Sequence, residues 1–137
     1  MTALNADAQT LYDFQSVPIL VVDDNAVVAA ALARILENAG FNPTICHRGV
    51  DALEHVRAHP CAAALVDIHL PDLNGLVVAQ KLREMLGPTT PIVIVSGDTS
   101  MEVINALPHV GATYFFSKPL NANDLLERMR EWLAKAD

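Results

Sequence analysis

Three carboxylates, a hydroxyl and an ammonium group each follow a short, mostly apolar run in this sequence. They are Asp23 and Asp24 after residues 19–22, Asp67 after 63–66, Ser96 after 92–95 and Lys118 after 113–117. Short apolar runs bounded by turn residues are typical of strands buried on both faces. If these strands run parallel in one sheet, their carboxyl ends share one edge. The sequence therefore predicts that the five polar groups meet at that edge.

Phosphoryl transfer is the chemistry that this set of groups favours. Like charges at short range raise each other's pKa, so three neighbouring carboxylates need a counter-charge. A hard divalent cation with oxygen ligands, Mg²⁺ or Mn²⁺, supplies it. The incoming phosphoryl oxygens also need donors, a role that suits Lys118 and Ser96. Asp67 is then a candidate nucleophile that forms an aspartyl phosphate.

The residues between these runs have the apolar spacing of helices. We expect helices at residues 25–39, 49–58, 76–86, 100–107 and from Asn121 onward, and a further strand at 41–47. Strands that alternate with helices predict an α/β protein with helices on both faces of a parallel sheet. The right-handed crossover rule favours a flavodoxin-like (βα)5 three-layer sandwich, with a parallel five-stranded sheet in the order 2-1-3-4-5.

Two local signals bound the fourth of these helices. The stretch Thr99-Ser100-Met101-Glu102 matches a capping box, which places the helix start at Thr99. Pro108 has no amide hydrogen and crowds the preceding turn, so the helix should end near Leu107. We therefore expect a short fourth helix.

Composition excludes several classes of function. Nine Lys and Arg residues stand against 16 Asp and Glu residues, a net charge of −7, so the chain lacks the basic surface that direct nucleic-acid binding needs. No apolar run approaches the roughly 20 residues that cross a bilayer. The N-terminal residues lack the basic and apolar regions of a secretory signal. We therefore expect a cytoplasmic protein with no membrane partner.

Cysteines and histidines outside these motifs show no metal-ligand spacing along the chain. We interpret Cys46 and Cys61 as small buried apolar residues. The remaining histidines, for which surface or loop positions are expected, are His47, His55, His59 and His109.

Four motifs together resemble one known family. They are Val21-Val22-Asp23-Asp24-Asn25, the stretch Leu65-Val66-Asp67-Ile68-His69-Leu70-Pro71-Asp72-Leu73-Asn74-Gly75, then Ile94-Val95-Ser96-Gly97, and Gly111-Ala112-Thr113-Tyr114-Phe115-Phe116-Ser117-Lys118-Pro119-Leu120. In order and spacing the chain resembles the receiver domain of two-component response regulators, from about residue 17 to 135. The resemblance implies a signalling domain of a phosphorelay. It implies no enzymatic activity beyond self-catalysed phosphorylation and dephosphorylation.

The resemblance assigns roles to the residues at the sheet edge. It implies that Asp67 accepts the phosphoryl group and that Asp24, Asp67 and the backbone carbonyl of His69 bind Mg²⁺, with Asp23 acting through water. It further implies that Lys118 pairs with the phosphoryl oxygens. The Lys118-Pro119 peptide bond is expected to be cis.

A switch is implied by the same resemblance. Ser96 is the switch hydroxyl and Phe115 the switch aromatic residue, which turns inward when Ser96 moves toward the phosphate. Tyr114 should point to the opposite face of the strand. The surface that reports the change would be formed by the fourth helix, the fifth strand and the last helix. His69 and Asp98 occupy positions that tune phosphorylation and hydrolysis rates, and we expect them to pair.

Domain organisation and partners follow from the same comparison. We interpret residues 1–16 as a flexible leader and residues 17–137 as the receiver domain. The expected phosphoryl donor is a histidine kinase or a histidine phosphotransfer protein. A downstream protein or a fused output domain would receive the signal, and a homodimer through the fourth and last helices is a further possibility.

Three other classes of protein remain as alternatives. A receiver-like interaction module that works without phosphorylation would be expected to have lost an acidic residue or the lysine, and this chain has all of them. A small-molecule phosphohydrolase that forms an aspartyl phosphate usually carries Asp-x-Asp, whereas Asp67 is followed by Ile68 and His69. A flavin-binding module would need phosphate-cradling loops, and these loops are acidic.

Overall fold

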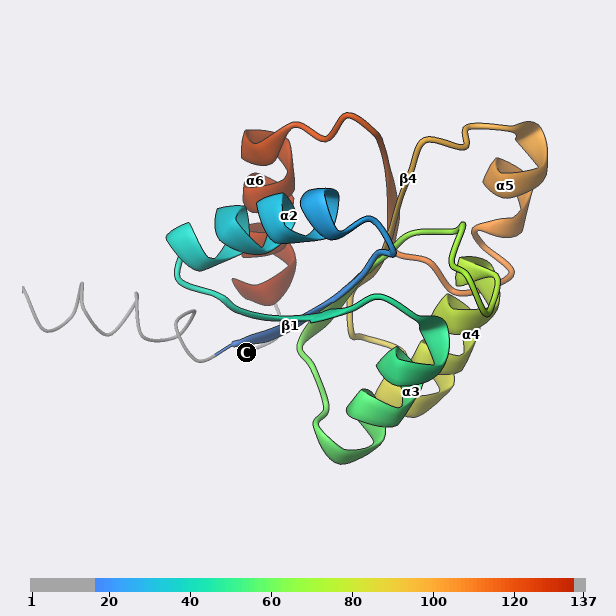
Figure 1. Ribbon diagram of the computed structural model, residues 1–137, viewed down its shortest axis with the longest axis horizontal. Helices are drawn as coiled ribbons and strands as arrows, with labels where there is room; N and C mark the ends of the chain where they lie inside the picture. The colour runs from blue at the N-terminus through green and yellow to red at the C-terminus, as the bar shows by residue number, and fades with distance from the viewer. Residues whose placement is uncertain (1–16, 135–137) are drawn as a thin grey trace, which may run out of the picture.

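Five parallel strands form one sheet in the computed structural model, which describes residues 17–134 (Figure 1). They are β1 (Pro18–Val22), β2 (Asn42–Cys46), β3 (Ala63–Val66), β4 (Ile92–Ser96) and β5 (Tyr114–Ser117). Their order in the sheet is β2-β1-β3-β4-β5, which confirms the predicted order. The expected leader, residues 1–16, lies outside the described part of the chain.

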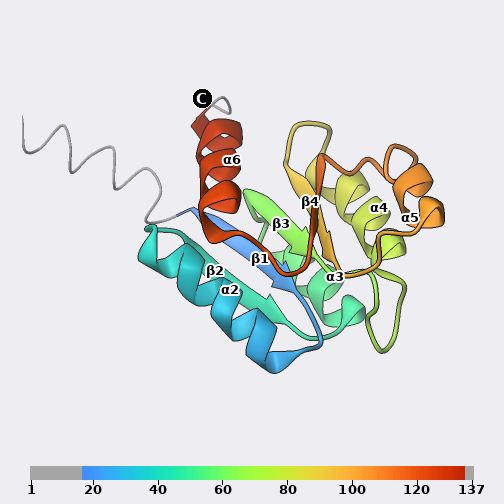
Figure 2. The same ribbon diagram turned by 90° about the horizontal axis from the view of Figure 1, so that it is seen from above.

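Five helices cover the two faces of this sheet. They are α2 (Ala26–Asn38), α3 (Gly49–Ala58), α4 (Gly75–Leu86), α5 (Met101–Ala106) and α6 (Ala122–Ala134). Helices α2 and α6 lie on one face, and α3, α4 and α5 lie on the other (Figures 1 and 2). The predicted three-layer sandwich is confirmed. Within the described residues, no helix is both long enough and apolar enough to cross a membrane.

The central strands are buried on both sides, as their unbroken apolar sequences predict. Successive side chains alternate between two hydrophobic cores. In β1, Ile19 and Val21 face α2 and α6, whereas Leu20 and Val22 face α3 and α4. All residues of β3 and β4 are buried. From β3 and β4, polar side chains can therefore reach the surface only where these strands end.

Short polar side chains begin most of the helices. Asn25 accepts hydrogen bonds from the amides of Val27 and Val28 at the start of α2, and Asn121 accepts one from Asp124 at the start of α6. Helix α5 is short, as expected, but its cap is Ser100, not Thr99. The amide of Ser100 donates to Asp98, and the Ser100 hydroxyl accepts from the amide of Val103, so the helix begins one residue later than the capping box indicates.

Candidate functional site

The backbone ladder of the sheet continues one residue past the strands at the carboxyl edge. The amide of Asp23 donates to the carbonyl of Cys46, and the amide of Asp67 donates to the carbonyl of Val22. Likewise, the amide of Lys118 donates to the carbonyl of Ser96. These bonds hold the residues that follow β1, β3 and β5 in register, so their side chains share one edge of the sheet.

Three carboxylates meet at this edge, as the sequence predicts. One oxygen from each of Asp23, Asp24 and Asp67 lies within 4.8 Å of the others. Asp23 and Asp67 are buried, with 3% and 8% of their surface exposed, whereas Asp24 is exposed. The cluster is therefore anchored in the core and open to solvent on one side. An all-oxygen donor set of this kind suits a hard divalent cation.

Lys118 bridges the two buried carboxylates. Its ammonium nitrogen lies 2.8 Å from Asp23 Oδ2 and 2.9 Å from Asp67 Oδ2. Burial by itself would lower the pKa of Lys118, but the hydrogen bonds to Asp23 and Asp67 outweigh it and hold that pKa above its ordinary value. The ammonium is thus charged at neutral pH. It offsets part of the negative charge of the cluster, while Asp23 Oδ1 accepts a hydrogen bond from the amide of Asn25.

Ser96 is fully buried at the end of β4, and its hydroxyl oxygen accepts a hydrogen bond from the amide of Asp98 at 3.1 Å. The Ser96 hydroxyl can therefore still donate a hydrogen bond to another acceptor. Asp98 in turn lies 3.0 Å from the ring of His69, measured from Oδ2 to Nε2. This solvent-accessible pair joins the loop after β3 to the loop after β4.

His47 contributes a contact that sequence reasoning missed. Its Nδ1 lies 2.8 Å from the carbonyl oxygen of Asp23, to which it donates. His47 directly follows β2, the neighbour of β1, so its place at the end of a strand was the available signal. The contact fixes the backbone that carries Asp23, although the imidazole does not touch the carboxylates.

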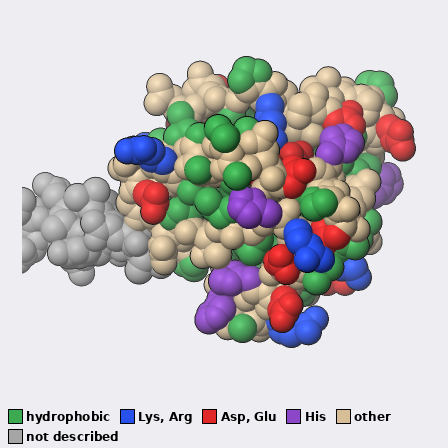
Figure 3. Space-filling model, in the orientation of Figure 1, with side chains coloured by type: hydrophobic (Ala, Val, Ile, Leu, Met, Phe, Trp, Pro, Cys, Tyr) green, Lys and Arg blue, Asp and Glu red, His purple; other side chains and the backbone are tan. Residues whose placement is uncertain are grey.

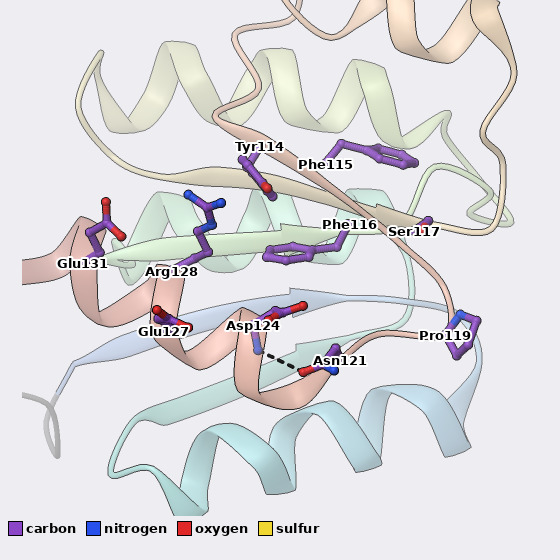
Figure 4. A pocket seen from close by; sticks show the side chains of 10 residues that line it. All are labelled: Tyr114, Phe115, Phe116, Ser117, Pro119, Asn121, Asp124, Glu127, Arg128 and Glu131. Atoms are coloured by element: carbon purple, nitrogen blue, oxygen red, sulfur yellow. Dashed lines mark hydrogen bonds between the residues drawn. The ribbon is translucent and has the colours of Figure 1, made fainter.

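Residues around β5 occupy the faces that alternation predicts. Phe115 is half-buried against the core on the α4 and α5 side. Tyr114 lies on the opposite face, where the centroid of its ring is 5.7 Å from that of Trp132. The guanidinium carbon of Arg128 lies 4.8 Å from the centroid of the Tyr114 ring (Figure 4). The Lys118-Pro119 bond that follows β5 is cis. The candidate site therefore adjoins a strand whose two faces carry different aromatic residues.

A hollow of about 530 Å³ lies between β5 and α6 (Figure 4). Aromatic residues of the strand line one wall, and Asp124, Glu127 and Glu131 line the other together with Arg128. This hollow touches Ser117 and Pro119, the residues on either side of Lys118. The site and the hollow thus share one short segment of chain.

Comparisons with known proteins agree with this geometry. A curated relative, the sensory/regulatory protein RpfC of Xanthomonas campestris, is 34% identical over 121 residues, covering 85% of this chain and 16% of RpfC. The chain therefore spans a small part of that protein. A CheY-like receiver domain protein from Methanospirillum hungatei JF-1 superimposes with a TM-score of 0.82 at 31% identity, over 87% of this chain and 94% of that one.

A response regulator from Burkholderia pseudomallei was solved with a phosphorylated aspartic acid, a calcium ion and citrate. It superimposes with a TM-score of 0.78 at 28% identity, over 88% of this chain and 71% of that one. The family model of the response regulator receiver domain matches residues 19–130. Fold, edge geometry and sequence agree, and the chain belongs to the response regulator receiver domain family.

Proposed function

We propose that this domain accepts a phosphoryl group on Asp67 in a reaction that depends on Mg²⁺. The bridge from Lys118 to Asp23 and Asp67 carries the proposal, because it places a charged donor directly beside the nucleophile. Membership of the receiver family supports it. The phosphoryl donor would be the phosphohistidine of a histidine kinase or of a phosphotransfer protein.

The donor set at the site fits a hard cation. Asp24, Asp67 and the backbone carbonyl of His69 would hold it directly, and Asp23 would act through a bound water. When bound, Mg²⁺ would neutralise charge that develops on the phosphoryl oxygens. Mn²⁺ has similar ligand preferences and would substitute for it.

The protein groups have separate tasks in the transfer. An Asp67 carboxylate oxygen forms the new P–O bond as the P–N bond of the donor breaks. Lys118 moves its ammonium contact from Asp67 to a phosphoryl oxygen. The hydroxyl of Ser96 donates a hydrogen bond to another of these oxygens. It can do so because its hydrogen bond with the amide of Asp98 uses only its acceptor capacity.

Phe115 would transmit the change to the surface. Movement of Ser96 toward the phosphate leaves room beside β5, and Phe115 turns into that room by packing, since it has no hydroxyl group. The surface formed by α5, β5 and α6 would then change shape for a downstream protein or a fused output domain. The hollow between β5 and α6 belongs to this surface.

Binding of beryllofluoride, a phosphoryl mimic, tests the proposal. We expect it to bind only with Mg²⁺ present and to shift amide NMR signals at Ser96, Phe115 and α6. Asp67→Asn should abolish binding. Asp51→Asn, which removes an exposed carboxylate on α3, should bind as the wild type does. If the wild type does not bind the mimic, the domain acts as an interaction module without phosphorylation.

A further inference from the structure

The residues that follow β1 and β2 are joined by two hydrogen bonds at the carboxyl edge of the sheet. The two strands lie side by side and pair as far as Val22 and Cys46 (Figure 2). One residue further along β1, the amide of Asp23 donates to the carbonyl oxygen of Cys46. Nδ1 of His47 donates back to the carbonyl oxygen of Asp23 at 2.8 Å, since a carbonyl group can only accept. The chain that leaves β2 thus holds both backbone groups of Asp23.

The peptide group between Asp23 and Asp24 depends on the contact with His47. A peptide group is a rigid plane, so the carbonyl oxygen of Asp23 moves together with the amide and the Cα atom of Asp24. In the part of the chain that the structure describes, His47 makes the only hydrogen bond to this peptide group. The preceding peptide group is held twice, by the carbonyl of Cys46 and by the amide of Asp67. The ring of His47 therefore fixes the direction in which the chain enters Asp24.

Asp24 depends on this support more than Asp23 does. The carboxylate of Asp23 is buried and accepts hydrogen bonds from the amide of Asn25 at 2.9 Å and from the ammonium of Lys118 at 2.8 Å. Asp24 is exposed, and none of the described residues donates a hydrogen bond to its carboxylate. Even so, one of its oxygens lies within 4.8 Å of oxygens of Asp23 and Asp67. The backbone therefore determines where the carboxylate of Asp24 lies.

We propose that His47 is a positioning residue for the metal-binding carboxylate of Asp24. The inference rests on the proposed function, in which Asp24 holds Mg²⁺ directly. Mg²⁺ demands nearly ideal octahedral geometry, so a carboxylate on a loosely held backbone binds it less tightly than one that is held in place. Partners that orient metal ligands commonly change the affinity about tenfold or more. His47 acts in this way through the backbone, without contact between its ring and the ion.

The contact lies at the solvent surface, because His47 is exposed. Asp, Glu and His side chains reach the surface of the face drawn in Figure 3 over the region where the strands end. Substitution of an exposed side chain usually changes the stability of a fold little. Replacement of His47 should therefore weaken metal binding without unfolding the domain.

Two variants of His47 test the proposal. The side-chain amide nitrogen of Asn takes the place of Nδ1, so His47→Asn keeps a donor for the carbonyl oxygen of Asp23. In Mg²⁺ titrations followed by amide NMR signals, we expect the affinity to fall roughly tenfold in His47→Ala and to stay near the wild-type value in His47→Asn. The urea midpoint should change little in both variants. His109→Ala, which removes an exposed histidine between α5 and β5, should change neither quantity.

Amide order parameters of the metal-free protein give a second measurement. The amide of Asp24 belongs to the peptide group that His47 holds. Its order parameter should therefore fall in His47→Ala from about 0.85, the value of a rigid backbone, toward about 0.6. His47→Asn should restore it. The amide of Asp67, which donates to the carbonyl of Val22, should keep its value in both variants and serves as the internal reference.

Unchanged Mg²⁺ affinity or an unchanged Asp24 order parameter in His47→Ala would overturn the proposal. An equal loss of affinity in His47→Ala and His47→Asn would also overturn it, because the hydrogen bond to Asp23 would then not be the cause. If the wild type binds no Mg²⁺, the proposed function is wrong. The order parameters of the metal-free protein then decide by themselves whether His47 fixes the peptide group before Asp24.

Discussion

At the scale of single residues, the pair formed by His69 and Asp98 joins the loop that follows β3 to the loop that follows β4. The ring of His69 is 71% exposed and the carboxylate of Asp98 is 28% exposed, so water can reach both groups. The amide of Ser100, followed by the Ser100 side chain and His69, lowers the pKa of Asp98 through hydrogen bonds. Asp98 is therefore charged at neutral pH, and its Oδ2 holds the His69 imidazole at 3.0 Å.

Removal of this pair should change how long the phosphorylated state lasts. Because His69 and Asp98 lie in the loops that directly follow β3, which ends just before Asp67, and β4, which ends at Ser96, we expect His69→Ala and Asp98→Ala each to change the hydrolysis rate several-fold. The double variant should differ little from either single variant, since each substitution already breaks the contact. Rates of dephosphorylation measured after loading with a small phosphodonor give the comparison. Equal lifetimes in the wild type and the double variant would rule out the tuning role.

Asp72 provides a second residue-scale test, because it caps a helix from a distant part of the chain. Its oxygens accept hydrogen bonds from the amides of Gly49 and Val50 at 2.8 and 2.9 Å. The amide of Val50, then those of Gly49 and Leu73, hold the pKa of Asp72 below its usual range, against a smaller opposing effect of burial. The ionised carboxylate thus stabilises the start of α3.

A lowered pKa in the folded state predicts a specific pH dependence. The stability that Asp72 contributes is fully present above the ordinary carboxyl pKa of about 3.9 and is lost as the pH falls through the lower folded value. Asp72→Asn should therefore destabilise the domain at pH 7, and the difference from the wild type should shrink at pH 3. Urea unfolding at both pH values measures it.

At the scale of elements, the strands and most helices were predictable because their signals are local. Unbroken apolar runs and the caps Asn25 and Asn121 required only neighbouring residues. The start of α5 was predicted one residue early, because Asp98 holds the amide of Ser100 and makes Ser100 the cap. The cap of α3 could not be predicted, since Asp72 accepts hydrogen bonds from the amides of Gly49 and Val50, which precede it by 23 and 22 residues.

Gly75, the first residue of α4, shows how closely this element packs against the site. A Cβ atom at this position would lie 1.9 Å from the carbonyl oxygen of Asp67 and 2.6 Å from the Cα of Ile68. Backbone atoms cannot move aside as the end of a side chain can. The absence of a side chain therefore allows the first residue of α4 to pack against the backbone of Asp67 and Ile68.

Gly75→Ala should displace the backbone of Asp67. We expect a loss of about 1 to 3 kcal/mol in the free energy of unfolding, as for other overpacked positions, together with weaker binding of Mg²⁺ and beryllofluoride. Gly97→Ala is the matched control, because a Cβ atom there meets nothing within 4 Å. Urea unfolding and Mg²⁺ titration of the two variants measure both effects. Unchanged stability and metal affinity in Gly75→Ala would show that the packing is looser than the contact implies.

At the scale of the whole molecule, the two edges of the sheet have different tasks. Parallel strands bring Asp23, Asp67 and Lys118 to the carboxyl edge, and this is why the candidate site could be predicted from strand ends alone. At the amino edge, one guanidinium joins two loops, the one between α4 and β4 and the one between α5 and β5. Arg83 donates to the carbonyl oxygens of Gly87, Thr90 and Gly111. None of these contacts could be predicted, because each depends on how α4 packs beside β4 and β5.

Replacement of Arg83 should therefore separate stability from phosphoryl chemistry. Arg83→Met keeps the apolar stem but leaves three carbonyl groups without their charged donor, so we expect a loss of about 2 to 4 kcal/mol in the free energy of unfolding. The urea midpoint should fall with little change in the slope of the free energy against urea concentration, since the variant and the wild type expose similar surface areas on unfolding. Lys81→Met, an exposed residue of the same helix, should change stability little.

Beryllofluoride affinity of folded Arg83→Met should stay within about twofold of the wild type, because Arg83 acts at the edge opposite Asp67 and distant sites behave independently. Mg²⁺-dependent beryllofluoride binding is measured at urea concentrations well below the unfolding midpoint, so that both the variant and the wild type are folded. A parallel loss of stability and affinity would mean that the loops at the amino edge hold the strand ends of the site in place. An unchanged affinity would mean that the buried strands alone position Asp23, Asp67 and Lys118.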